Sequence, residues 1–194
     1  MTTLADDLRL ALDIADRVDA LTMARFGASD LVVEEKPDLT PVSDADKAAE
    51  QLIRDALAAA RPEDTIYGEE QGGTLEHTGR RWILDPIDGT KAFASACPLF
   101  GTLIALQHQG RPVLGAIHQP VMGQLLVGDG AVTTLNDRPV RTRPTTRHEA
   151  ATLLTSDPLN PAKYQNRAAY DALSRRARLV RTWGDCYGYL LLSS

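Results

Sequence analysis

The sequence predicts a layered α+β protein, because two helical patterns near its start are followed by a series of short strands. Up to Phe26 the apolar residues recur every three or four positions, which is typical of one face of an amphipathic helix, and Gly27 ends the pattern. From Phe100 to about Arg143 the pattern changes to short apolar runs separated by turn residues, which indicates successive strands.

The expected elements follow one another in a simple order. After the first helix, a short strand at 31–33 leads into a loop from Lys36 to Asp44, and a second helix begins there with Ser43 or Asp44 as its N-cap. Many apolar residues of this second helix are alanines, which favours close packing against the first helix. Further strands are expected at 65–67, 81–84, 101–107, 113–118, 124–127, 152–155 and 178–183, with a helix at about 162–176.

Length, charge and cysteine content narrow the class of protein. The 194 residues carry a formal net charge of −5, which argues against a general nucleic-acid binder. The longest apolar runs, such as Leu103 to Leu106, are too short to cross a bilayer, and the acidic start of the chain is unlike a signal peptide. Cys97 and Cys186 give no disulfide framework. We therefore expect a cytoplasmic protein that binds neither nucleic acid nor a membrane.

Three acidic residues lie where predicted strands end. Glu69 follows one strand, and Asp85 and Asp88 follow the next apolar strand. Side chains at neighbouring strand ends converge at one edge of a sheet, and Mg²⁺ prefers a few carboxylates together with water and substrate phosphate. Pro86 stiffens the turn between the two aspartates, so both face the same point with the Ile87 carbonyl between them. These groups therefore indicate a site for a divalent cation.

A phosphate site is expected beside these carboxylates. Gly89 and Thr90 come next, where we expect a short helix to begin, and the free N–H groups of a helix N-terminus bind phosphate. Asp44 lies at another loop-to-helix junction, and with Thr90 it would hold an attacking water in line with the phosphorus. Each group alone has an ordinary explanation as a turn or solvated residue. Their occurrence together favours a phosphate-ester hydrolase.

Two segments, with a third upstream of them, carry a resemblance to a known family. They are Gly68-Glu69-Glu70 and Trp82-Ile83-Leu84-Asp85-Pro86-Ile87-Asp88-Gly89-Thr90, preceded by Lys36 to Asp44. This combination resembles the inositol monophosphatase superfamily over essentially the whole chain. The resemblance implies a layered α-β-α-β sandwich of the inositol-monophosphatase and fructose-1,6-bisphosphatase type, with the active site at the junction of its two sheets.

The resemblance also implies the roles of the residues in these motifs. Family members use two or three Mg²⁺ ions, with Asp88 bridging two of them, and at least one of those sites is retained here. Water attacks the phosphate directly, so no covalent intermediate forms. The implied metal ligands are Glu69, Asp85, the Ile87 carbonyl and Asp88; the phosphate or substrate contacts are Asp88, Gly89, Thr90 and Asp185; and the catalytic residues are Asp44, Thr90 and Glu69.

Within the superfamily, the chain is most similar to the histidinol-phosphatase branch. Three segments are of that type: Lys36 to Asp46, Asp88 to Phe93 and Trp183 to Tyr187. Asp185 fits this branch chemically, because a carboxylate beside the phosphate would pair with the ammonium group of L-histidinol phosphate. Its alternative explanation is a helix N-cap after Gly184. Inositol-1-phosphate and 3′-phosphonucleotide phosphatases share the metal site and remain alternatives.

The chain departs from the family pattern at its C-terminal end. Family members continue through a Trp-Asp pair whose aspartate is a further metal ligand, whereas neither Trp82 nor Trp183 precedes an aspartate. We therefore expect a C-terminally incomplete sandwich, with residues 1–143 carrying the metal and phosphate site and residues 144–194 beginning a C-terminal α/β region. Family members are commonly homodimers. A catalytically incomplete form that still binds metal or phosphate is the alternative from another class.

Overall fold

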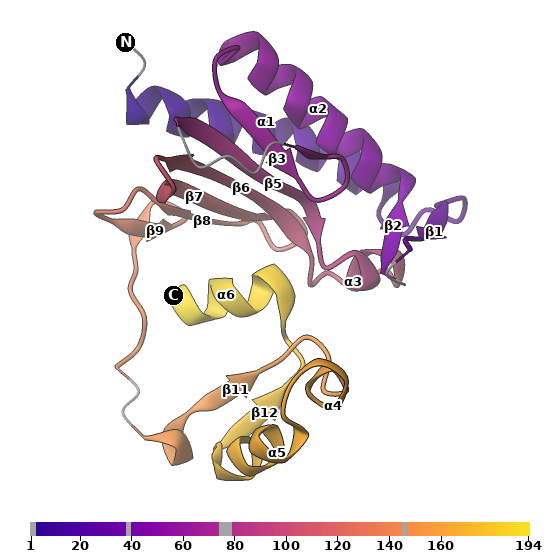
Figure 1. The fold of residues 1–194 in the computed structure, drawn as a ribbon, viewed down its shortest axis with the longest axis vertical. Coiled ribbons are helices and arrows are strands. Elements are labelled where there is room, and N and C mark those ends of the chain that lie inside the picture. Colours follow the sequence, from indigo (N-terminus) through magenta and orange to yellow (C-terminus); the bar gives the residue numbers. More distant parts are fainter. Residues whose placement is uncertain (1–2, 38–39, 74–78, 145–146) are drawn as a thin grey trace.

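The described residues of the computed structural model form one large sheet and two small ones. A helix lies between the large sheet and one small sheet, and two long helices cover the outer face of the large sheet (Figure 1). The structure describes residues 3–37, 40–73, 79–144 and 147–194. Residues 38–39, in the expected loop from Lys36 to Asp44, lie outside that description. The helices are α1 (Leu4–Arg25), α2 (Asp44–Ala60), α3 (Thr90–Ala94), α4 (Asn160–Tyr164), α5 (Arg167–Arg176) and α6 (Asp185–Ser193), with a 3₁₀ turn, η1, at His148–Ala150.

The described strands form one large sheet and two small ones. The large sheet contains β3 (Thr65–Gly68), β4 (Gly72–Gly73), β5 (Arg80–Asp88), β6 (Gly101–His108), β7 (Arg111–Gln119), β8 (Gln124–Gly128), β9 (Thr133–Leu135) and β10 (Arg138–Pro139). Its order is β10-β9-β8-β7-β6-β5-β3-β4. Within this sheet only β3 and β5 pair in parallel among the described strands. The small sheets are the antiparallel pair β1 (Val33–Glu35) and β2 (Pro41–Ser43), and the parallel pair β11 (Thr152–Leu154) and β12 (Leu179–Arg181).

Several of the expected elements need correction. The strand expected at 31–33 lies at 33–35, as β1, and the loop expected from Lys36 to Asp44 contains a further strand, β2. The helix expected at 162–176 is divided, because Gln165 leaves the helical conformation, with φ −139° and ψ −149°. Asn166 then caps α5 by accepting the N–H of Ala169 at 3.0 Å. The strand expected at 81–84 also continues, as β5, as far as Asp88, with a shift of register after Asp85. The two motif aspartates therefore lie on the last part of a bulged strand.

Capping boxes begin both long helices. Thr3 and Asp6 form one at the start of α1, and Ser43 and Asp46 form the other at the start of α2. In each, the cap hydroxyl accepts the N–H of the third helical residue, whose carboxylate accepts the N–H of the cap residue. Of the two caps expected for α2, Ser43 is therefore the cap, and Asp44 is the first helical residue.

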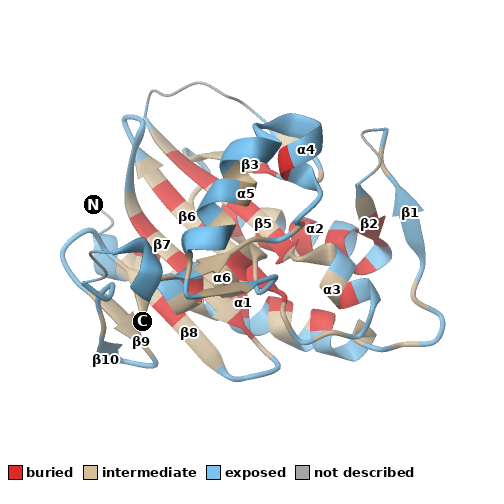
Figure 2. Ribbon diagram, turned by 90° about the horizontal axis from the view of Figure 1, so that it is seen from below, coloured by how far each residue is buried: buried red, intermediate tan, exposed pale blue. Residues whose placement is uncertain are grey.

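The main core lies between the two long helices and the large sheet. In Figure 2 buried segments run along β5, β6 and β7 and along the sides of α1 and α2 that face them. The two helices also contact each other, as the small residues of α2 predict. The cluster consists of Ala11, Ile14, Ala15, Val18, Ala49, Ile53, Leu57, Trp82, Leu84, Ile104, Leu106 and Leu114.

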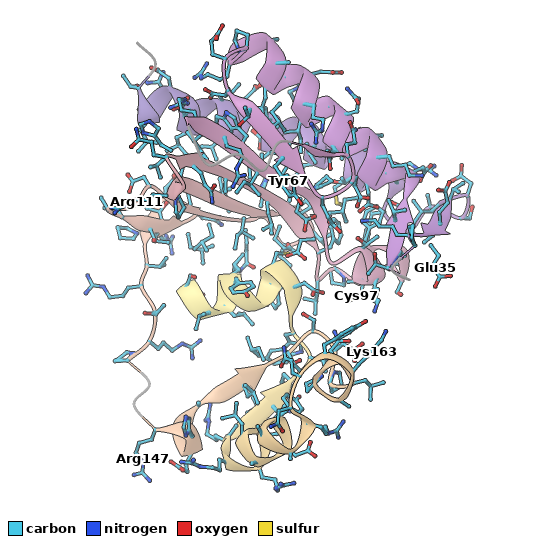
Figure 3. All side chains as sticks on the ribbon, viewed as in Figure 1. Glu35, Tyr67, Cys97, Arg111, Arg147 and Lys163 are labelled. Atoms are coloured by element: carbon cyan, nitrogen blue, oxygen red, sulfur yellow. The ribbon has the colours of Figure 1, made fainter. Side chains whose placement is uncertain are left out.

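A second helical layer, α6, lies on the other face of the large sheet (Figure 1). It contacts β6 and β7, and its Cys186 and Leu190 are buried. Side chains of the sheet project into the space between the sheet and α6 (Figure 3). Beyond α6 lie β11 and β12 (Figure 1). Within the described residues, each helix is too short or too polar to span a membrane. The division of the chain at residues 143 and 144 stays a prediction.

A buried ion-pair network ties α1 to the end of α2 and to β5. Asp7 is fully buried and accepts hydrogen bonds from Arg61 and Arg80, each at 2.8 Å. Arg80 also donates to Asp64 at 2.9 Å, and Asp64 accepts the indole N–H of Trp82 at 2.9 Å. Removing one charge from such a network leaves its buried partners uncompensated.

We expect Asp7→Asn to lower the free energy of unfolding by about 3 kcal/mol, because two guanidinium groups lose their shared carboxylate. Urea denaturation followed by circular dichroism measures this change. A loss below about 1 kcal/mol, the range of exposed ion pairs, would contradict the importance of the network.

Candidate active site

The parallel pairing of β3 with β5 brings two of the expected ligands together. Gly68, the last residue of β3, lies opposite Leu84 of β5. The next residue of each strand is acidic, Glu69 after Gly68 and Asp85 after Leu84. The N–H of Glu69 donates to the Leu84 carbonyl at 3.1 Å, which holds the start of the loop against β5. The backbone therefore confirms that these two strand ends converge.

The carboxylates at this edge repel one another. Asp85 is the least well solvated of them, because within the described residues its buried Oδ1 has no hydrogen-bond partner. Burial, together with the charges of Glu69 and Asp88, raises the pKa of Asp85 well above its ordinary value. Burial and the charge of Asp185 raise the pKa of Asp88 to about 6. Both shifts favour the protonated form, so this group of acids is costly to ionise without a nearby cation.

The residue that meets Thr90 is Asp46, which corrects the expectation for Asp44. The Thr90 hydroxyl lies 3.2 Å from Asp46 Oδ1 and 3.2 Å from the Ile87 carbonyl oxygen. Asp46 is fully buried, and burial raises its pKa. The Asp44 carboxylate instead accepts a hydrogen bond from Arg25 at 2.9 Å and is 45% exposed.

The helix start explains why Asp46 and not Asp44 reaches Thr90. Ser43 is the N-cap, so Asp46 takes the third helical position, from which a side chain turns back toward the cap. Its Oδ2 accepts the N–H of Ser43 at 2.8 Å, which leaves Oδ1 directed at Thr90. The spacing Ser-x-x-Asp before an alanine-rich helix is the sequence signal that identifies this residue.

Lys36 is a second residue of the site to which the sequence analysis gave no role. Its Nζ lies 3.0 Å from Glu69 Oε1 and 2.8 Å from Glu70 Oε1. Burial lowers the pKa of Lys36, but the hydrogen bonds to Glu70 and Glu69 outweigh it and raise the pKa overall. Lys36 is therefore the cation that balances part of the acidic group. No motif spacing marks it, because its position depends on how β1 and its loop fold.

The turn after β5 is held over an aromatic cluster. Gly89 has φ +94° and precedes α3, so the short helix expected there is present. A Cβ on Gly89 would lie 2.9 Å from the Leu99 carbonyl oxygen, so the site accommodates only glycine without rearrangement. Beneath the turn Phe93 and Phe100 pack edge to face, with ring centroids 4.9 Å apart.

Asp185 reaches the site from α6, although it is distant in sequence. Its backbone has φ +53°, and its N–H donates to Ser156 Oγ at 3.0 Å. Its charge raises the pKa of Asp88, and the neighbouring Cys186 thiol contacts the Asp88 carbonyl oxygen at 3.6 Å. Asp185 begins α6 but is not its N-cap, which is Gly184. The structure therefore brings Asp185 to the edge of the acidic group.

These residues fit a divalent cation chemically. The unpartnered Asp85 oxygen and the raised pKa values of Asp85 and Asp88 are those of oxygen ligands that lack a counter-ion. In the described part of the chain no three His, Cys, Asp or Glu side chains form a ready-made metal site. Lys36 holds one expected ligand, Glu69.

Comparison with known proteins decides the family. A profile described as "Inositol monophosphatase family" matches residues 4–192. The chain belongs to the inositol monophosphatase family. It is 40% identical to a histidinol-phosphatase of Chlorobaculum parvum, over 97% of this chain and 73% of the relative. A histidinol-phosphatase of Mycobacterium tuberculosis is 42% identical, over 97% of this chain and 75% of the relative.

Solved structures of the inositol monophosphatase family share the fold. One from Zymomonas mobilis superposes with a TM-score of 0.83 and is 39% identical, over 99% of this chain and 74% of that chain. One from Thermotoga maritima has a TM-score of 0.82 at 26% identity, over 93% of this chain and 69% of that chain. The resemblance and the layered α+β fold predicted from the sequence are confirmed, and the chain belongs to a family of enzymes that hydrolyse phosphoric monoesters.

We expect Asp88→Asn to change how stability depends on pH in EDTA. The pKa of Asp88 is about 6 in the folded protein, above its ordinary 3.8, so the folded state binds more protons between these values. Stability from this group is therefore lost as the pH rises through that range. The variant should gain about 3 kcal/mol relative to wild type between pH ~4 and pH ~7. Urea denaturation across this range measures the difference, and a difference that does not vary with pH would contradict it.

Proposed function

We propose that this chain is a Mg²⁺-dependent histidinol-phosphatase, which hydrolyses L-histidinol phosphate to L-histidinol and phosphate by direct attack of water. The observation that carries the phosphatase chemistry is the Thr90–Asp46 hydrogen bond beside the acidic group of Glu69, Asp85 and Asp88. The substrate is inferred from the two histidinol-phosphatases that match 97% of the chain.

The acidic group would hold the metal. Glu69, Asp85, Asp88 and the Ile87 carbonyl are the groups that would bind Mg²⁺, and two or three ions are the expected number. Bound Mg²⁺ supplies positive charge that stabilises the phosphate as negative charge develops on it. Asp88, Gly89 and Thr90 would contact the phosphate.

Thr90 and Asp46 would position the attacking water and receive its proton. The Thr90 hydroxyl has two acceptors within reach, Asp46 Oδ1 and the Ile87 carbonyl oxygen. Because Thr90 donates to one of them, its lone pairs are free to accept a hydrogen from water. Burial raises the pKa of Asp46, which makes it a better base for that proton. No side chain needs to become phosphorylated in this reaction.

Asp185 would select the substrate. It lies at the edge of the acidic group, close enough for its charge to raise the pKa of Asp88. A carboxylate there would pair with the ammonium group of L-histidinol phosphate, whereas an inositol phosphate offers only hydroxyl groups. The match to an inositol-1-monophosphatase of Mesorhizobium japonicum covers 52% of this chain, which is less than the histidinol-phosphatases cover. We also propose a cytoplasmic homodimer.

The first test is phosphate release by this chain from L-histidinol phosphate and from inositol 1-phosphate, each with Mg²⁺ and with EDTA. We expect release from histidinol phosphate that requires Mg²⁺ and a much slower rate with inositol 1-phosphate. Asp88→Asn should reduce release to the EDTA level, because a ligand is lost.

Two controls separate the alternatives. Asp185→Asn should raise the KM for histidinol phosphate by about tenfold, the size of one lost charge-assisted contact, and leave that for inositol 1-phosphate unchanged. Release from neither substrate by a folded chain that still binds Mg²⁺ would contradict the proposal and indicate the catalytically incomplete form.

A second test compares two aspartates in the first turn of α2. We expect Asp46→Asn to lower kcat by about 100-fold or more, because Thr90 loses the base behind it. Asp44→Asn removes the same charge from the same helix turn but faces Arg25, so its kcat should stay within about twofold of wild type. Equal losses in both variants, measured as initial rates of phosphate release, would exclude Asp46 as the specific base.

A further inference from the structure

A buried carboxylate on α2 holds the loop that carries Glu69. Glu50 is fully buried. Its Oε2 accepts the backbone N–H of Glu70 at 2.7 Å, and its Oε1 accepts that of Gln71 at 3.1 Å. One helical turn along, Arg54 donates from Nε to Oε1 at 2.8 Å. The described partners of this carboxylate are therefore the loop backbone and one guanidinium group.

The same pair also touches both ends of the loop. A Cβ built on Gly68 would lie 2.1 Å from Glu50 Oε1 and 2.3 Å from Glu50 Cδ, so the backbone rests directly on the carboxylate. At the other end Arg54 Nη2 donates to the Gly72 carbonyl. Loop 68–72 is thus held at its start, its middle and its end by two side chains of α2.

This support fixes the position of Glu69. On one side the Glu69 N–H donates to the Leu84 carbonyl of β5, and on the other side Glu50 binds the next two N–H groups. A buried charge costs free energy unless it is paired. The Glu50 carboxylate is paired with Arg54 and with two N–H groups of this loop. Mutation of a residue that orients a metal ligand typically lowers metal affinity by about 10- to 100-fold.

We propose that Glu50 is a positioning residue that sets the affinity of the site for a divalent cation, by fixing loop 68–72 and with it Glu69. The inference rests on the proposed function, because it takes Glu69 to be a ligand. Glu50 has no contact with the acidic group that would make it a ligand itself, within the interactions the structure describes. It acts through the backbone.

The test is Mg²⁺ binding, measured by titration calorimetry on the metal-free chain at a temperature where circular dichroism shows it folded. Glu50→Gln keeps the shape of the side chain but places an amide NH₂ against a backbone N–H. We expect its dissociation constant for Mg²⁺ to rise by about 10- to 100-fold. The matched control is Asp7→Asn, which removes another fully buried, arginine-paired carboxylate outside the loop. Its dissociation constant should stay within about twofold of wild type.

Several outcomes would overturn the inference. Binding by folded Glu50→Gln as tight as wild type would exclude a positioning role, and equal weakening by Asp7→Asn would show that the effect is global. Absence of saturable Mg²⁺ binding by wild type would overturn the metal site itself. If Glu50→Gln does not fold, Gly68→Ala tests the same contact from the loop, since its new Cβ meets the Glu50 carboxylate. It should weaken Mg²⁺ binding, and unchanged binding would overturn the proposal.

Discussion

The parallel pairing of β3 with β5 is the constraint on which the site depends. In a parallel pair both strands end at the same edge, so the residues that follow Gly68 and Leu84 lie side by side. Both residues are acidic, and the hydrogen bond from Glu69 to the Leu84 carbonyl fixes them there. An antiparallel pairing would have placed Glu69 at the opposite edge of the sheet. The bulge near the end of β5 and the turn at Gly89 then keep Asp88 and Thr90 at this same edge.

The arrangement is unfavourable for folding in the absence of a cation. Burial and like charges raise the pKa values of Asp85, Asp88 and Asp46 in the same direction, so ionising each one destabilises the folded state. Lys36 offsets part of this charge. A ligand that prefers the ionised carboxylates would stabilise the folded state. A site of this kind therefore lowers the stability of the cation-free folded state and raises its affinity for a cation.

Local patterns in the sequence predicted the long helices, the central strands and the meeting of the strand ends at Glu69 and Asp85. Local patterns did not predict which of two nearby acidic residues faces Thr90, because that depends on which residue caps the helix. Asp44 and Asp46 are two positions apart, and only the identity of Ser43 as the cap decides which one faces Thr90. The helix expected at 162–176 breaks before Asn166 without a proline or glycine to mark the break. Lys36 and Glu50 belong to the site through tertiary contacts that no local pattern contains.

Helix α2 shows why charged residues in a helix are a poor guide to its exposed face. Asp46, Glu50 and Arg54 recur every four residues and form a stripe beside the apolar stripe that contains Ile53. Asp46 and Glu50 are as deeply buried as Ile53, since the stripe faces Thr90 at one end and loop 68–72 at the other. A single rigid helix thus sets the distance between the proposed base and the proposed ligand loop. The apolar stripe packs this helix against the core, so the geometry of the site depends on the packing of the core.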